Sequence, residues 1–473
     1  MPYHPAIGDL RSQTPRIGVI VGLVAAAMTL LALGPQRPEL PSEQWYDLAS
    51  QQVMGADMTY RLGMALQRFD AVLPISGEDT GHQLIEEAVA GYERLGLRRH
   101  PNPLAVYRLG VIYGHRGYRD KAGDFLTAAA GMDEANSNRY YALEEIYSEG
   151  KPPQDLSAQI QSLETDSDWL TDIAIEDGYR RLGEEQKANT VAARRDLRSQ
   201  RFGLGCALLS GVAGLLVVTG GLTILVLFLR WGLTVRRPRA RVPFLVPWTV
   251  IDVLEAVAAL LLAMVVAGQG SALLWHNLLE GVVGPTGKAL LLTAQYIVVA
   301  VVILLLVLHR IRPRSPHPFS SLGLRVRHAW RLAGTGLVAY ASFVAILALA
   351  AVLFRGMFAL QAGDSIIQSV KTPGEAVIYF VLACVLAPVF EEIVFRGYVY
   401  AGLRRVAAPR PAMLLGGLIF ASVHMNAGAI IIITLIGILL CYLYERTRSL
   451  LPGMVAHGLH NALVLAVVLL QST

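Results

Sequence analysis

The sequence predicts an all-α membrane protein, a polytopic bundle of about nine spanning helices with a soluble helical-repeat domain inserted after the first span. Three observations support this fold class. Of the 473 residues, 54% are hydrophobic and only 16% are charged. This composition is too apolar for a soluble globule and too charged for a chain that lies wholly in a membrane. Apolar runs of spanning length recur, and one long polar segment interrupts them.

The charge pattern indicates membrane topology and argues against a nucleic-acid partner. The net charge is +5, and the basic residues cluster in short loops between the apolar runs. We therefore expect a lipid bilayer around most of the chain. The predicted organisation is an N-terminal membrane anchor (1–35), a repeat domain (36–201), flanking membrane helices (202–365) and a catalytic core (366–473).

The first apolar run, residues 17–34, is long enough to span a bilayer and follows Arg11 and Arg16. A cleaved signal peptide is the alternative, because the run is short for a span. We interpret it as an uncleaved anchor, since the small-residue pattern of a cleavage site is poor.

The polar segment 36–201 repeats itself. Leu143 follows Leu109 by 34 residues, and Tyr147 follows Tyr113 by the same interval. A 34-residue period of paired helices is typical of tetratricopeptide repeats, which the segment resembles in degenerate form. A helical domain without repeats is the alternative. Repeats of this kind imply a surface for a peptide or protein partner. Further repeat positions are Tyr60, Leu62, Gly63, Ala88, Gly110, Gly117, Ala122, Tyr179, Gly183 and Ala188.

Eight more apolar runs follow, and the loops between them alternate in charge. By the positive-inside rule, all basic loops lie on one side when nine spans are counted. This places the N-terminus in the cytoplasm, and the repeat domain and the C-terminus outside. The basic loops are 230–243, 309–331, 402–411 and 444–449. The runs are 204–229, 246–267, 288–308, 331–354, 375–391 and beyond, 412–424, 428–444 and 453–470.

Three charges lie in the apolar stretch CVLAPVFEEIVFRGYVY, residues 384–400. Ionisable side chains inside a membrane are costly and should face protein or water. On an α-helix, Glu392 and Arg396 share a face and can pair. Glu391 is rotated by about 100° and lacks that partner, so it stays available for chemistry. The alternative is that all three only tie helices together.

Two more polar pairs follow on later helices. FASVH places Phe420 and His424 one turn apart, and HGLHN does the same for His457 and Asn461. Glu391 and His424 each lie 13 residues from the loop 404–411, so both should lie roughly 20 Å from it. His457 and Asn461 follow Pro452 by 5 and 9 residues, so they should lie only about 8 to 14 Å from the cytoplasmic end of their helix. Helix tilt can close that gap, so we expect one buried pocket that opens to the cytoplasm.

This set of side chains suits hydrolysis by water. A desolvated Glu391 can act as a general base. His424 and His457 can share the water, bind a metal or donate a hydrogen bond, and the amide of Asn461 can stabilise an oxyanion. Two histidines with Glu391 also form a zinc ligand set with an open position, but Glu391 would then not be a free base.

The ordered motifs resemble the CPBP family, which comprises type II CAAX prenyl endopeptidases and Abi-like bacterial relatives. EExxxR is present as Glu391, Glu392 and Arg396, FxxxH as Phe420 and His424, and HxxxN as His457 and Asn461. The resemblance covers about 370–470. It implies intramembrane endopeptidase activity, in which Glu391 and His424 activate water, His457 and Asn461 form the oxyanion site, and Glu392, Arg396 and Phe420 are supporting.

The resemblance also bears on cofactors and substrate. Family members are often labelled metalloproteases, yet the sequence has no HExxH helix. We favour a metal-free mechanism, and zinc or another divalent metal stays open. The arginine- and alanine-rich composition is common in bacteria, which predicts the inner membrane and a peptide or membrane-anchored protein as substrate.

Two other classes of function remain as alternatives. The first is a non-proteolytic membrane scaffold, or an immunity or secretion factor, whose repeat domain binds a partner. The second is a transporter with a proton relay through Glu391 and the histidines. The earlier spans carry no inverted repeat of the polar pattern, which argues against transport.

Overall fold

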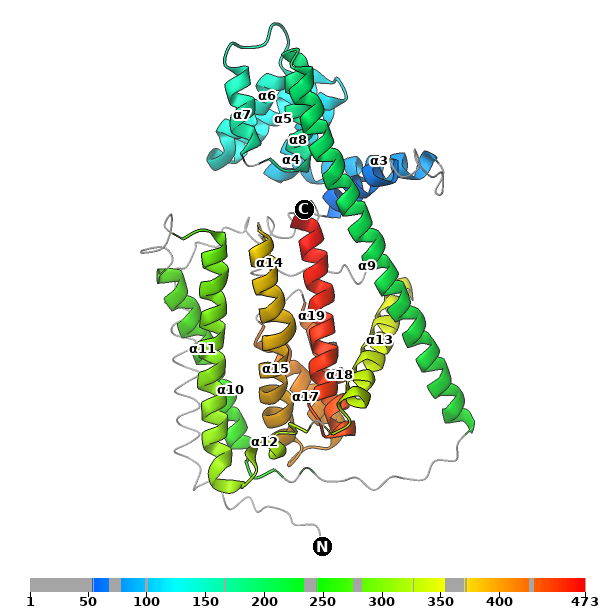
Figure 1. Ribbon diagram of the computed structural model, residues 1–473, viewed down its shortest axis with the longest axis vertical. Coiled ribbons are helices and arrows are strands. Elements are labelled where there is room, and N and C mark those ends of the chain that lie inside the picture. The colour runs from blue at the N-terminus through cyan, green and yellow to red at the C-terminus, as the bar shows by residue number, and fades with distance from the viewer. Residues whose placement is uncertain are drawn as a thin grey trace. The chain divides into compact units, whose positions relative to one another are not determined.

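The computed structural model is entirely helical over the residues it describes, with no strand among them, and this confirms the all-α prediction (Figure 1). Internal contacts divide the chain into a unit of residues 38–210 and a unit that contains residues 211–472. The predicted first span, 17–34, lies outside the described residues. The described residues are 53, 55–67, 78–97, 101–165, 167–233, 244, 246–274, 283–325, 327–353, 370, 372–424 and 429–472.

The unit of residues 38–210 contains short helices arranged in successive pairs, and the last pair includes the start of a long helix. Between residues 78 and 181, each helix packs against the next α-helix along the chain. The pairs are residues 55–67 with α3 (Glu78–Gly96), α4 (Pro103–His115) with α5 (Arg119–Met132), α6 (Ser137–Tyr147) with α7 (Leu156–Glu164), and α8 (Trp169–Arg181) with α9 (Glu185–Leu233).

The turns within three of these pairs recur at a fixed spacing. Gly117, Gly150 and Gly183 have φ angles of +86°, +89° and +76°, and each lies 33 residues after the previous one (150 − 117 and 183 − 150). Glycine adopts this backbone conformation without the penalty that a Cβ brings. The helices that precede two of these turns begin at side-chain caps, Asn102 and Asp168. The internal repeat is therefore structural, whereas its assignment to the tetratricopeptide family stays a prediction.

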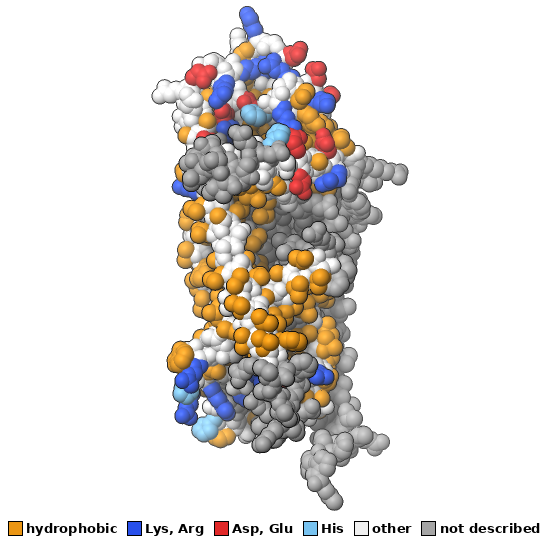
Figure 2. Space-filling model, turned by 90° about the vertical axis from the view of Figure 1, so that its right-hand side faces the viewer, with side chains coloured by type: hydrophobic (Ala, Val, Ile, Leu, Met, Phe, Trp, Pro, Cys, Tyr) orange, Lys and Arg blue, Asp and Glu red, His pale blue; other side chains and the backbone are white. Residues whose placement is uncertain are grey.

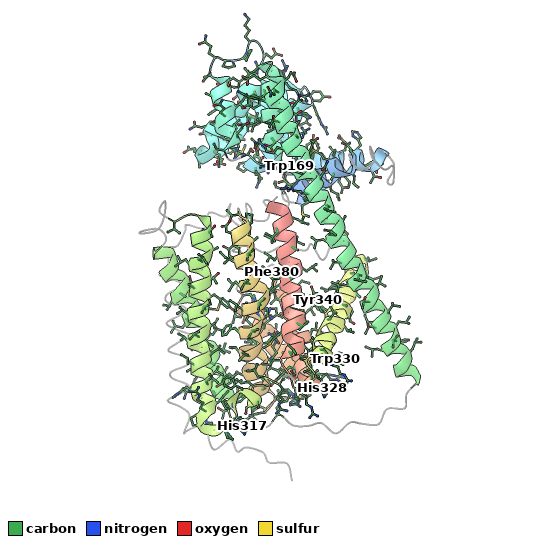
Figure 3. All side chains as sticks on the ribbon, viewed as in Figure 1. Trp169, His317, His328, Trp330, Tyr340 and Phe380 are labelled. Carbon is green, nitrogen blue, oxygen red and sulfur yellow. The ribbon has the colours of Figure 1, made fainter. Side chains whose placement is uncertain are left out.

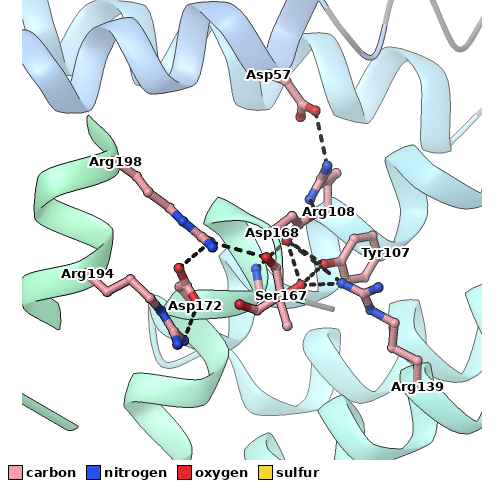
Figure 4. Close-up of polar contacts among 10 residues, drawn as sticks. Asp57, Tyr107, Arg108, Arg139, Ser167, Asp168, Asp172, Arg194 and Arg198 are labelled. Carbon is pink, nitrogen blue, oxygen red and sulfur yellow. Dashed lines mark hydrogen bonds and ion pairs between the residues drawn. The ribbon is translucent and has the colours of Figure 1, made fainter. Parts of the chain in front are cut away.

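A polar network joins α4, α8 and the helix of residues 55–67 (Figure 4). Arg108 pairs with Asp168 at 2.5 Å and with Asp57 at 3.1 Å. Tyr107 lies 2.7 Å from the hydroxyl of Thr171, on α8. Hydrogen bonds to charged groups are among the stronger ones in proteins, so this network fixes the packing of helices that are far apart in sequence.

The second unit contains helices that can cross a bilayer. Seven described helices are long and apolar enough for this, by length and composition. The predicted span 412–424 is not among them, because α17 (Pro409–Ser422) has 14 residues and is only about 21 Å long. The count of nine spans stays a prediction. The seven are Glu185–Leu229, Val250–Gly270, Thr286–Arg314, Ala329–Ala350, Pro373–Leu403, Ile430–Thr447 and Leu451–Leu470.

These helices pack as a bundle in which α11 (Pro285–Ile311), α14 (Pro373–Phe380) and α19 (Leu451–Ser472) run side by side (Figure 1). α19 also packs along α13 (Ala329–Leu353), which carries Tyr340 near its middle (Figure 3). Hydrophobic side chains cover the visible face of the bundle, and basic side chains border it at one end (Figure 2). An apolar belt with a basic rim is what a bilayer requires.

The helix at 373–403 departs from α geometry twice. After α14 it becomes a π-helix at η6 (Val381–Leu386), returns to α at α15 (Ala387–Glu391) and is π again at η7 (Glu392–Tyr400). It ends as α16 (Ala401–Leu403). Wider π turns are rare and often accompany functional sites. The two acidic residues of the predicted site lie where α15 passes into η7.

Candidate active site

Glu392 and Arg396 form the ion pair that their spacing predicts. Arg396 Nη1 lies 2.9 Å from Glu392 Oε1, and both side chains are at most 1% exposed. The Arg396 guanidinium also lies over the ring of Phe420, 4.1 Å from its centroid. Each buried charge thus has an opposite charge or an aromatic face beside it, which reduces the cost of burial.

His457 lies between the two glutamates. Its Nδ1 is 3.3 Å from Glu392 Oε1 and its Nε2 is 3.7 Å from Glu391 Oε2. His457 therefore lies at the level of the glutamates, although its distance from the loop predicted a shallower position. Because the carboxylate of Glu392 is paired with Arg396 and accepts hydrogen bonds only, Nδ1 of His457 is the donor in that contact. Nε2 is left to face Glu391.

A glycine one turn before His457 makes room for this contact. A Cβ at Gly453 would lie 2.3 Å from Glu392 Oε2 and 3.1 Å from its Cδ. Gly453 is on α19, the helix that also carries His457 and Asn461. The sequence PGMVAHGLHN thus presents a gap for one carboxylate and an imidazole beside it.

Glu391 is not left without contacts, although its rotation away from Arg396 suggested that. The hydroxyl of Tyr296, on α11, donates a hydrogen bond to Glu391 Oε1 over 3.2 Å. Oε2, which faces His457, has no hydrogen-bond partner among the described residues. The side chain of Glu391 is 15% exposed, against 1% for Glu392, although Oε2 of each glutamate is buried without a hydrogen-bond partner among the described residues. Glu391 is therefore the less buried of the two side chains, and Oε2 is its unbonded oxygen.

His424 lies at the end of α17 and contacts the same aromatic ring. Its Nδ1 lies 2.7 Å from the carbonyl oxygen of Phe420, and its ring meets the Phe420 ring edge-on at 4.7 Å between centroids. The ring of Phe420 also meets that of His457, at 5.6 Å. A carbonyl only accepts, so Nδ1 of His424 carries the proton and Nε2 is an acceptor. The ring of Phe420 thus packs against the imidazole rings of both His424 and His457.

Asn461 makes a contact that the sequence did not predict. Its Nδ2 donates a hydrogen bond of 2.7 Å to the carbonyl oxygen of Ala383, in η6. The other π-helix receives a similar bond, from Trp248 Nε1 to the carbonyl oxygen of Tyr398 over 2.9 Å. Side chains thus satisfy carbonyl groups in both π-helices, and one donor of the Asn461 amide is committed to this task.

The side chains that could hold zinc, Glu391, His424 and His457, are not grouped as a metal site in this structure. Within the described ranges, which include Glu391, His424 and His457, no three His, Cys, Asp or Glu side chains are placed to hold one metal ion. His424 turns its Nδ1 to its own helix, and His457 is held between two carboxylates. We therefore derive no step through a metal.

Sequence reasoning missed two groups near the site. Tyr296 belongs to an earlier span outside the quoted motifs, and its only signal was a hydroxyl in an apolar run. His460 was visible in HGLHN but belongs to no motif. Its Nδ1 lies 3.4 Å from the hydroxyl of Tyr340, on α13, so this pair joins α13 to α19.

Residues 373–463 match the family model for type II CAAX prenyl endopeptidase, Rce1-like. The match extends from α14 into α19 and so includes all seven residues of the predicted motifs. It confirms the resemblance to this family, and it supports CAAX-type intramembrane protease activity in general. No curated protein and no solved structure matches the chain.

Proposed function

We propose that the protein is an intramembrane endopeptidase that hydrolyses a peptide bond with water activated by Glu391 and His424. One observation carries the proposal. The carboxylate of Glu391 and the imidazole of His457 face each other at 3.7 Å, and the rings of His424 and His457 both meet the ring of Phe420 edge-on. They lie within the segment that matches the endopeptidase family.

The reaction needs a base, an oxyanion donor and a proton for the leaving group. Glu391 Oε2 takes a proton from water while the water oxygen bonds to the scissile carbonyl carbon. The acceptor nitrogen of His424 helps to orient that water. When both ring nitrogens of His457 carry protons, its Nε2 can donate to the oxyanion, and so can the second amide hydrogen of Asn461. When the C–N bond breaks, Glu391 returns its proton to the amine, and the products are a carboxylic acid and an amine.

The test is a comparison of protein N-termini in native membranes. Cells carry the wild-type protein or Glu391→Gln at matched levels, because glutamine keeps the size of the side chain and removes the base. We expect a set of termini that appears only with the wild type. Monodisperse elution of the variant in detergent shows that it is folded. If both membranes yield the same termini, the proposal fails.

We further propose that the domain at 36–201 recruits the substrate, a peptide or membrane-anchored protein, outside the cytoplasm. The repeated helix pairs support this proposal, since stacked pairs form extended binding surfaces. A chain without 36–201 should lose cleavage of its natural substrate and keep cleavage of a short peptide that spans the same bond. Full cleavage of the natural substrate by the truncated chain would contradict recruitment.

The contacts of Glu392 favour one alternative, a non-proteolytic scaffold or an immunity or secretion factor. Glu392, Arg396 and His457 contact one another in the bundle, as expected of groups that tie helices together. Under this alternative, Glu391→Gln supports the normal phenotype of the cell, whereas Arg396→Ala lowers the amount of folded protein.

A further inference from the structure

Tyr296 is a half-buried phenol that contacts Glu391 from outside the segment with the motifs. It lies on α11, and its ring meets that of Phe390 edge-on, 5.8 Å between centroids. Its hydroxyl lies 3.2 Å from Glu391 Oε1. Because an ionised carboxylate only accepts hydrogen bonds, the phenol is the donor. The packing against Phe390 fixes the direction from which this bond reaches the carboxylate.

The two oxygens of Glu391 thereby have different surroundings. Oε1 is bound by Tyr296, while Oε2 is 3.7 Å from Nε2 of His457. The charged and titratable groups around Glu391 are Tyr296 from α11, His457 from α19, and Glu392 with its partner Arg396 from the same helix. Tyr296 is the donor within hydrogen-bond distance of Glu391 among these residues.

We propose that Tyr296 is a positioning residue for Glu391. Its hydrogen bond holds Oε1, turns Oε2 toward His457 and the attacking water, and stabilises the ionised carboxylate. The inference rests on the proposed function in one respect, that Glu391 is the base. The hydrogen bond itself can be tested without a substrate.

The first measurement is infrared difference spectroscopy of the full chain in detergent. Subtracting the spectrum of Glu391→Gln isolates the carboxyl bands of Glu391. In Tyr296→Phe these bands should shift in frequency, because the hydrogen bond from the phenol to Oε1 is gone. Tyr379→Phe is the matched control. It removes a hydroxyl from a buried tyrosine on α14 and should leave the bands unchanged.

The second measurement is kcat and KM on a quenched peptide that spans the mapped cleavage site. Tyr296→Phe should lower kcat roughly tenfold with little change in KM, because the base is no longer held toward the water. A fluorinated tyrosine at 296 is a stronger donor, so it should keep kcat near that of the wild type and move the carboxyl bands away from their positions in Tyr296→Phe. This second variant keeps the test valid if phenylalanine perturbs folding.

The outcomes separate the two proposals. Equal carboxyl band positions in Tyr296→Phe and Tyr379→Phe would overturn the positioning role, whatever the activity. So would an equal loss of kcat in both variants. If Glu391→Gln cleaves like the wild type, the proposed function fails, while the infrared spectra still decide whether Tyr296 binds Glu391.

Discussion

At the scale of single residues, one ion pair makes the site tolerable in an apolar bundle. Glu392 and Arg396 are buried and 2.9 Å apart, and Glu392 also contacts Nδ1 of His457. Removing one partner of a buried pair costs roughly 3–5 kcal/mol, because the other charge stays buried. Glu392 thus contacts both Arg396 and His457, whereas Glu391, the proposed base, has no contact with Arg396 within ion-pair distance among the described residues.

Gly453 sets the distance between α19 and this pair. We expect Gly453→Ala to destabilise the bundle by about 1–3 kcal/mol, since its Cβ would lie 2.3 Å from Glu392 Oε2. The displaced carboxylate would release His457, so cleavage should fall as well. Thermal unfolding in detergent measures the first effect, and the peptide assay measures the second.

Gly334→Ala is the control, because no atom lies within 4 Å of its Cβ position on α13. It should be neutral or stabilise the protein by up to about 1 kcal/mol, through helix propensity. If Gly453→Ala and Gly334→Ala have the same unfolding temperature and the same cleavage rate, α19 does not approach Glu392 as closely as the structure shows.

At the scale of elements, local patterns predicted which helices carry the site but not their exact course. The i, i+4 spacing paired Glu392 with Arg396 correctly, since charge spacing is a local property. The two π-helices could not be predicted, because their widened turns are stabilised by distant donors such as Asn461 and Trp248. Tyr296 was missed for the same reason. Its contact with Glu391 depends on the packing of α11, which no motif encodes.

The pairing of α4 with α8 gives a prediction about pH. Burial tends to raise the pKa of Asp168, but Arg108 and hydrogen bonds from Thr171 outweigh it and hold that pKa below its ordinary value. A carboxylate with a depressed pKa stabilises the fold fully above about pH 4 and loses this contribution as the pH falls further. Asp168→Asn should therefore cost about 1–2 kcal/mol near pH 7, a modest value because Asp168 is 34% exposed.

Hydrogen exchange of residues 101–181 in the full chain, corrected for intrinsic rates, measures this difference. Asp155→Asn is the control. Asp155 also precedes a helix, but its side chain makes no cap hydrogen bond there and its residue is exposed. The gap between wild type and Asp168→Asn should be constant from pH 7 to 5 and shrink below about pH 4. A gap that widens on acidification would contradict the sign of this argument.

At the scale of the whole molecule, hydropathy predicted seven spans that the structure also contains as long apolar helices. Residues 412–424 are not among them, because α17 ends at Ser422 after 14 residues, which an apolar composition does not reveal. α17 packs along α18 (Ile430–Thr447), a helix of spanning length. Gly417 approaches the carbonyl of Thr434 closely, and small residues allow such close helix packing in membranes.

Membrane orientation is the prediction that belongs to the whole chain. Basic loops should face the cytoplasm and the helical-repeat domain should face outward, because Lys and Arg in short loops resist translocation. Single cysteines report this after Cys206, Cys384 and Cys441 are replaced by alanine. Both Lys151, in the repeat domain, and Arg410, in a basic loop, are exposed. In intact spheroplasts an impermeant maleimide should label Lys151→Cys and reach Arg410→Cys only after lysis. Labelling of Arg410→Cys before lysis, with Lys151→Cys protected, would contradict the predicted orientation.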